Sequence, residues 1–303
     1  MDRLRWMETF VKVAELGHFS GAARGLGVSR AAVSKYVEAL EERLGAQLIH
    51  RTTRRLSLTR EGEAYLQRCR RILEEIADAE ASVGEMRASP RGILRINGPM
   101  SFGHLHLAPA IADFLTRHPD IQVECELNDH YVGVVEEGWD VVVRIGTLED
   151  SSLIAHRLAP ARLVLCASPD YFAQHGTPER PEALSAHRCL GYSHAAAGNA
   201  WRFHGPEGQT ARVPFSSRLR VNNGDAIRKA LLLGLGMAVM PTFIVGEDLQ
   251  TGALRTAMTD WRCEESSIWA VCPPSRRLSA KVRAFIDFLH RRFGPRPYWD
   301  LVA

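Results

Sequence analysis

The sequence has no long apolar run and no closely spaced pair of cysteines. No stretch approaches the roughly 20 apolar residues that cross a bilayer, and the charged start MDRLRWMETF has no signal-peptide core. Six cysteines are scattered without a C-x-x-C pair, which favours reduced thiols over disulfides or a zinc site. We therefore expect a cytoplasmic protein with no membrane partner.

Catalytic signatures are also missing. The sequence contains no G-x-S-x-G, P-loop, G-x-G-x-x-G or H-E-x-x-H motif. The histidines His130, His156, His187, His194 and His204 lack the spacing of a catalytic triad or a metal site. We expect neither catalytic nor metal-binding residues and no cofactor, so the chain is predicted not to be an enzyme.

Positive charge is concentrated at the start of the chain. Residues 1–60 contain 11 Lys and Arg against 6 Asp and Glu, a net +5, whereas residues 91–303 contain 23 against 22, a net +1. A basic block ahead of a nearly neutral body indicates that the first domain meets a polyanion. With 46% hydrophobic residues, the 303-residue chain is long enough for two or three globular domains.

Residues 29–44 have the pattern of an amphipathic helix. Ser29 is a good N-cap and Gly45 stands where a left-handed residue would end the helix. Residues 20–26 form a second short helix, joined to the first by a tight turn at residues 27–28. The apolar stripe of the longer helix consists of Val33, Val37, Leu40 and Leu44. Two such helices indicate a helix-turn-helix, although a small helical domain with a solvated basic face has the same local pattern.

A basic hairpin follows the two helices. Strands are expected at residues 47–50 and 56–58, and the arginines between them suit phosphate contacts and the minor groove. The expected partner is double-stranded promoter DNA. The candidate DNA-binding residues are Ser20, Ser29, Arg30, Ala31, Ser34, Lys35, Glu38, Arg51, Thr52, Thr53, Arg54 and Arg55.

A long helix is predicted from Thr59 onward. Its apolar residues follow a heptad spacing that favours pairing with a second copy of the helix, although packing against its own domain is the alternative. The seam consists of Tyr65, Cys69, Ile72, Ile76, Ala79, Val83 and Met86. The sequence thus predicts three parts: a winged helix-turn-helix at residues 1–59, a linker helix and hinge at 60–90, and a regulatory domain at 91–303.

Strand and helix patterns alternate in the third part. The order predicts a βαβαβ unit with a parallel sheet and helices on both faces, followed by a second α/β unit. Expected strands are residues 92–97, 121–127 and 140–145, and expected helices are 102–118 and 131–137. The second unit runs from 162 to 240, a strand at 269–272 returns to the first, and a helix at 281–293 closes the chain. We expect lobe 1 at about 91–162 and 268–303, and lobe 2 at about 163–267.

The chain resembles the LysR-type transcriptional regulators along its whole length. The matching motifs in the first part are Phe19-Ser20-x-Ala22-Ala23, Leu26-x-Val28-Ser29, Leu40-Glu41-x-x-Leu44-Gly45 and Leu58-Thr59-x-x-Gly62. In the third part they include Pro99-x-Ser101-Phe102-Gly103, Phe114-x-x-x-His118-Pro119, Gly138-x-Asp140-Val141 and Gly234-x-Gly236-Met237. The resemblance implies a winged helix-turn-helix and a two-lobed α/β effector domain of the type II periplasmic-binding-protein kind. Arg30, Ala31 and Gly133 depart from the residues usual in the family.

The resemblance also implies a small organic effector, with aromatic and carboxylate compounds as candidate classes. Ser101 and the neighbouring N–H groups could hold a carboxylate, although Ser101 is equally suited to cap a helix. The candidate effector-binding residues are Ser101, Phe102, Gly103, His130, Arg144, Gly146, Thr147, Phe203, Asn222, Asn223, Pro241 and Thr242. Self-association as a dimer or tetramer is expected, with RNA polymerase as a further candidate partner.

Two other functions fit parts of the pattern. A solute-binding protein, or a ligand-dependent enzyme, could carry an accessory helical head of this kind. The first is disfavoured by the missing signal peptide and the second by the missing catalytic cluster. A regulator whose cleft no longer binds a ligand is also compatible with the sequence.

Overall fold

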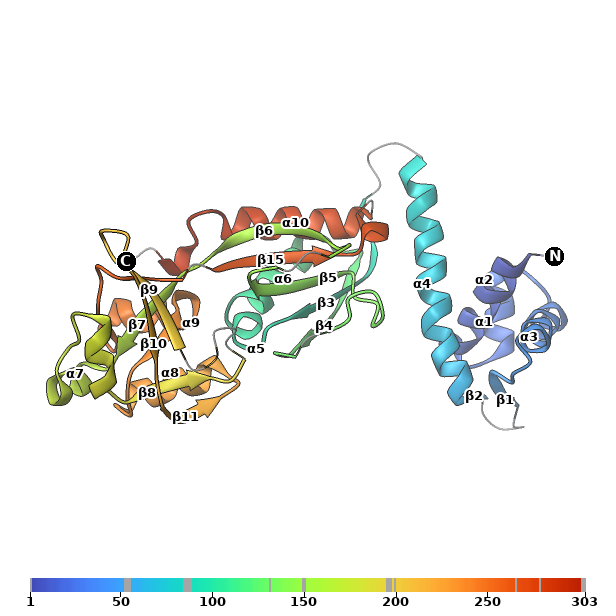
Figure 1. Ribbon diagram of the computed structural model, residues 1–303. Coiled ribbons are helices and arrows are strands. Elements are labelled where there is room, and N and C mark those ends of the chain that lie inside the picture. Colours follow the sequence, from blue (N-terminus) through green and yellow to red (C-terminus); the bar gives the residue numbers. More distant parts are fainter. Residues whose placement is uncertain are drawn as a thin grey trace. The chain divides into compact units, whose positions relative to one another are not determined.

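The computed structural model describes residues 2–51, 56–83, 89–130, 132–148, 151–194, 198, 200–264, 266–277 and 279–300. The chain divides into two compact units, residues 1–88 and 89–303 (Figure 1). Within the described residues, no helix is both long and apolar enough to span a membrane. All six cysteine thiols are free.

Unit 1 begins with three helices whose ends are fixed by local caps. They are α1 (Arg3–Leu16), α2 (Phe19–Leu26) and α3 (Arg30–Leu44). Ser29 Oγ accepts the Ala32 N–H at 3.1 Å, and Gly45 ends α3 in the left-handed region at φ 65°, as the sequence predicts. The three helices enclose one apolar core that includes Phe10, Val33 and Val37.

The wing is held to α3 by hydrogen bonds to a glutamate side chain, and it packs closely against the next helix. It consists of β1 (Ile49–Arg51) and β2 (Leu56–Leu58), paired antiparallel. Glu41 Oε1 accepts the N–H groups of Leu48 (2.8 Å) and Ile49 (3.1 Å). A Cβ at Gly62, in α4 (Arg60–Val83), would overlap the carbonyl oxygen of Leu48. Only glycine therefore lets α4 pass this close to the wing.

The predicted seam of α4 divides between two environments. Tyr65 and Cys69 pack into the core of unit 1, and the Tyr65 ring lies 5.9 Å from that of Phe10. Ile72, one turn beyond Cys69, keeps 40% of its surface exposed. The predicted self-pairing seam is thus taken up by the chain's own core at its first two positions. Met86 lies outside the described residues.

Lobe 1 of unit 2 is built on a five-stranded sheet of order β4-β3-β5-β15-β6. The strands are β3 (Gly92–Gly98), β4 (Ile121–Leu127), β5 (Val141–Gly146), β6 (Ile154–Ala161) and β15 (Ser266–Cys272). Its helices are α5 (Met100–Phe102), η1 (Gly103–Leu107), α6 (Ala108–Arg117), α10 (Ala280–Phe293) and the short turns η3 (Pro274–Arg276) and η4 (Tyr298–Asp300). The predicted helix at residues 102–118 is a continuous run with a π-helical turn at η1.

One prediction for lobe 1 is confirmed for part of the sheet and another is wrong. The three predicted strands are parallel, since β3 is parallel to β4 and β5, but the whole sheet is mixed because β15 is antiparallel to both β5 and β6. Residues 132–140 form turns and not the helix predicted at 131–137; Tyr131 lies outside the described residues. Gly133 N–H instead donates to the Glu137 carboxylate at 2.9 Å, a local bond that competes with a helix.

Lobe 2 contains three small sheets, ordered β12-β7-β13, β10-β9-β14 and β11-β8. Its strands are β7 (Leu163–Ala167), β8 (Cys189–Tyr192), β9 (Ala200–His204), β10 (Thr210–Pro214), β11 (Ser217–Val221), β12 (Ala238–Pro241), β13 (Arg255–Thr256) and β14 (Arg262–Cys263). Its helices are α7 (Pro169–His175), η2 (Pro181–Ala186), α8 (Gly224–Leu232) and α9 (Thr242–Thr251). The sequence did not predict α9 or β10.

One apolar core continues from lobe 1 into lobe 2. It joins Phe102 and Phe285 of lobe 1 to Ile227 and Phe243 of lobe 2. The apolar part of the boundary between the lobes is therefore closed by packing between α5 and α9.

Candidate DNA interface and effector cleft

The N-terminal part of α3 presents small and basic side chains to solvent. Arg30, Ala31 and Lys35 are exposed, as are Ser29 just before the helix and Ser20 on α2. Val33 and Val37 face the core on the other side. A slender, basic helix face of this kind can enter the major groove, where arginine and lysine reach base edges or phosphates.

Ser34 and Glu38 are tied to each other. The Ser34 hydroxyl donates to Glu38 Oε1 at 3.1 Å on the exposed side of α3. The wing tip at Thr52, Thr53, Arg54 and Arg55 lies outside the described residues, so its role stays a prediction. Arg51 ends β1, one residue before that tip.

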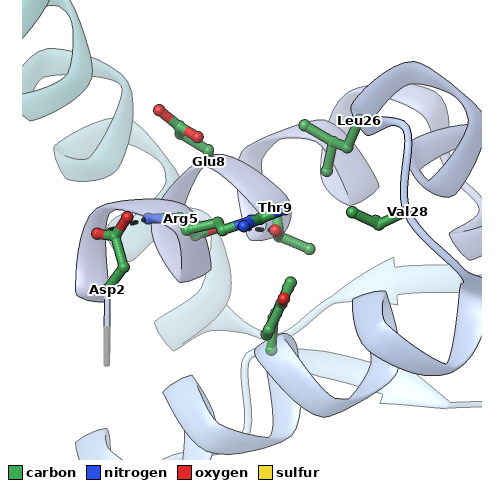
Figure 2. Close-up of a pocket in the computed structure, with 7 residues that line it drawn as sticks. Asp2, Arg5, Glu8, Thr9, Leu26 and Val28 are labelled. Carbon is green, nitrogen blue, oxygen red and sulfur yellow. Dashed lines mark hydrogen bonds between the residues drawn. The ribbon is translucent and has the colours of Figure 1, made fainter.

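A hollow of about 230 Å³ lies in unit 1 where α1 meets the turn between α2 and α3 (Figure 2). The Arg5 guanidinium lies over the Tyr36 ring, 5.6 Å from its centroid. The other lining residues are Asp2, Glu8, Thr9, Leu26 and Val28. The hollow is small, charged and open, unlike the enclosed, mainly apolar sites that bind organic ligands.

The strongest effector candidate is Ser101, the second residue of α5. It is 6% exposed and its hydroxyl donates to Asp225 Oδ2 of α8 at 2.7 Å. Pro99 occupies the cap position of α5, so Ser101 is not the N-cap considered above. Arg144 is half-buried and donates to the Val132 carbonyl at 2.9 Å.

The remaining candidates fall into three groups. Phe102 and Phe203 are both 0% exposed and belong to apolar cores, so neither ring lies at a surface that an effector could contact. His130, Thr147 and Asn222 are exposed, whereas Pro241 is half-buried. The other four candidates make contacts that hold the local backbone in place. Gly103 packs against Leu127, and the Gly146 carbonyl accepts a hydrogen bond from Trp269. Asn223 caps α8, and Thr242 donates to the Arg162 carbonyl.

A buried histidine, not anticipated from the sequence, joins the two lobes. His106 lies in the π-helical turn, with Nε2 2.8 Å from the Phe243 carbonyl of α9 and Nδ1 2.6 Å from the Tyr298 hydroxyl. A carbonyl only accepts, so Nε2 carries the proton and Nδ1 accepts from Tyr298. Trp299 packs on the ring at a centroid distance of 4.4 Å. The neutral imidazole therefore connects α9 of lobe 2 to η1 and η4 of lobe 1.

Acidification is expected to weaken this junction. Burial lowers the pKa of His106, and the positive charge of Arg292 lowers it further, against the raising effect of the Phe243 carbonyl. The unfolded chain thus takes up the proton first, and stability is complete above about pH 6.5 and declines below it. The slope of melting temperature between pH 7 and 5 should be shallower for His106→Gln. Equal slopes would contradict this role.

Comparison with known proteins identifies the class of protein. Residues 4–63 match the bacterial regulatory helix-turn-helix model of the lysR family, and residues 87–294 match the LysR substrate binding domain. The chain is 35% identical over 289 residues to the HTH-type transcriptional regulator CrgA of Neisseria meningitidis, covering 95% of this chain and 96% of that one. It is 33% identical to the HTH-type transcriptional activator AaeR of Escherichia coli, covering 95% and 93%.

Solved structures agree. CrgA from Neisseria meningitidis superposes with a TM-score of 0.61 at 34% identity, covering 95% of this chain and 97% of that one. The Vibrio cholerae virulence activator AphB superposes with a TM-score of 0.59 at 28% identity, covering 95% of this chain and 98% of that one. The chain belongs to the LysR family of transcriptional regulators. It is a DNA-binding regulator with an effector-binding domain and not an enzyme, and the resemblance seen in the sequence is confirmed.

Proposed function

We propose that two copies of unit 1 bind the half-sites of a two-fold operator and read bases with the N-terminal part of α3. The observation that carries this proposal is the exposed face of Arg30, Ala31 and Lys35 directly behind the Ser29 cap. Caps fix the position at which the helix begins, and small side chains allow close approach to the groove. Ser20, Ser34 and Glu38 flank this face.

Self-association would follow from the uncovered part of α4. Ile72 keeps 40% of its surface exposed on a helix with charged faces, and pairing with a second copy would bury it. Dimers or tetramers are both compatible with this pairing. A small organic effector at the lobe boundary near Ser101 would change the relative positions of the paired heads, in the cytoplasm where the chromosome lies, and RNA polymerase is a candidate partner there.

Replacing Arg30 and Lys35 with alanine should remove base discrimination. Base-edge contacts of this kind each contribute about 1–3 kcal/mol of discrimination, so affinity for a selected operator should fall much more than affinity for random DNA. Gel-shift titrations with both DNAs measure the ratio of operator affinity to random-DNA affinity. Arg43→Ala, on an exposed position at the far end of α3, is the matched control. An equal loss on both DNAs would assign these residues to phosphates only.

Replacing Arg54 and Arg55 with alanine should weaken binding to all sequences. Each lost phosphate contact reduces counterion release, so the slope of log affinity against log salt should flatten by about 0.9 per contact. Titrations at several salt concentrations measure this slope. If affinity and slope are unchanged, the wing tip does not contact DNA.

A further inference from the structure

Three hydrogen-bond donors at the start of α5 have acceptors within the chain itself. Ser101 Oγ donates to Asp225 Oδ2 at 2.7 Å, across the lobe boundary. The Met100 N–H donates to Asp129 Oδ1 at 2.9 Å. The Gly103 N–H donates to the Pro99 carbonyl at 2.7 Å. Of the groups that the sequence offered to an effector carboxylate, the Ser101 hydroxyl and the Gly103 N–H already have acceptors, and the hydroxyl holds a carboxylate.

Close packing brings Asp225 to Ser101. Gly224, the first residue of α8, is buried, and a Cβ there would overlap Ile244 Cδ1 and lie 3.4 Å from Ser101 Oγ. A glycine at this position therefore lets the start of α8 approach α5. Asp225 follows it directly and is half-buried. The contact is set by the backbone and does not depend on a freely rotating surface side chain.

Two arginines of lobe 2 bond to acceptors other than Asp225. Arg228, one turn further along α8, donates to Asp248, with Nη2 2.7 Å from Oδ1, while its positive charge still acts on Asp225. Arg220 donates to the Ser193 carbonyl at 3.3 Å. The direct donor to Asp225 is the Ser101 hydroxyl, so a carboxylate already lies beside this donor.

The charge of Asp129 acts on Tyr192 across the boundary between the lobes. Burial raises the pKa of Tyr192 to about 12, and the negative charge of Asp129 contributes to the rise. Since Tyr192 belongs to β8 of lobe 2 and Asp129 follows β4 of lobe 1, the field of this carboxylate crosses the boundary. The same field that disfavours a tyrosinate would disfavour any other anion placed there.

We propose that Asp225 is an internal carboxylate that occupies the anion position of the effector cleft, latching lobe 2 to Ser101 and selecting against carboxylate effectors. The proposal rests on the cleft function proposed above and narrows the effector class. A ligand that displaces Asp225 must offer Ser101 an acceptor without adding negative charge, so it is uncharged or cationic. Asp225 is then a residue that determines effector specificity.

The latch is tested by hydrogen–deuterium exchange on the full chain. Ser101→Ala and Asp225→Ala should each raise exchange in residues 99–107 and 224–232, and the double variant should show no further increase, because both changes break one contact. Asp225→Asn keeps an oxygen that can accept from Ser101 and should stay protected. Additive effects of the two alanine changes, or no change in either, would overturn the latch.

The selectivity is tested with benzoate and benzamide, which share a ring and differ in charge. In calorimetric titrations, benzoate should bind the Asp225→Asn variant at least tenfold more tightly than the unaltered chain, while benzamide changes less than threefold. An equal benzoate response in both proteins, including none in either, would overturn the selectivity. Missing operator preference in a gel shift would instead overturn the proposed DNA function, and would leave the exchange result standing.

Discussion

Replacing Asp140 with asparagine is expected to lower the unfolding free energy of unit 2 by about 3–5 kcal/mol, the usual cost of removing one member of a buried ion pair. The Asp140 side chain is 2% exposed, with Oδ1 3.1 Å from Arg276 Nε and Oδ2 3.7 Å from Lys281 Nζ. Oδ2 also accepts the Arg95 N–H at 3.0 Å. Asparagine would keep the shape and leave two buried cations without their carboxylate.

Urea unfolding followed by tryptophan fluorescence measures this loss, because five of the six tryptophans lie in unit 2. Asp113→Asn is the matched control. Asp113 also pairs with an arginine, Arg292, but half of its side chain is exposed (51%), and exposed pairs contribute at most about 1 kcal/mol. A loss below 1 kcal/mol for Asp140→Asn would show that the burial of this carboxylate does not stabilise the unit.

Elements whose signals are local could be predicted from the sequence. The α3 helix has an apolar stripe, a serine cap and a closing glycine within 17 residues, and the structure places the helix between Ser29 and Gly45. The β4 strand was predicted with the bounds that the structure shows, Ile121–Leu127. In both cases periodicity and the flanking residues determine the element, and distant parts of the chain only complete the packing.

Features that depend on distant partners could not be predicted. The insertion of β15 between β5 and β6 decides that the sheet is mixed, and it joins residues more than 100 positions apart. Asp140 matched a family motif, but its partners Arg276 and Lys281 lie far along the chain. Ser101 was recognised as a donor, whereas its acceptor, Asp225, is 124 residues away. Sequence reasoning identified the donor group, but it could not show that a residue so far along the chain would bond to it.

Replacing Phe102 with alanine should cost about 3–5 kcal/mol of unit 2 stability. The sequence suggested Phe102 as an effector contact through its backbone N–H, beside Ser101. In the structure it is 0% exposed, and its ring centroid lies 5.3 Å from Phe243, 5.4 Å from Phe293 and 5.7 Å from Trp299. Alanine would leave a cavity where lobe 1, α9 and the C-terminal turn meet, and urea unfolding measures the loss.

Two further variants separate a core role from a ligand contact. Phe102→Leu retains much of the apolar volume, so it should lose a smaller part of the stability. Met100→Ala, two residues earlier and 41% exposed, should stay within about 0.5 kcal/mol of the unaltered chain. If the Phe102→Ala protein is as stable as the unaltered chain, the core role is wrong and the ring would be assigned to the effector cleft. If the Phe102→Ala protein unfolds at a lower urea concentration, the Phe102 ring belongs to the core shared by the two lobes. That core excludes water and limits how far the lobes can open.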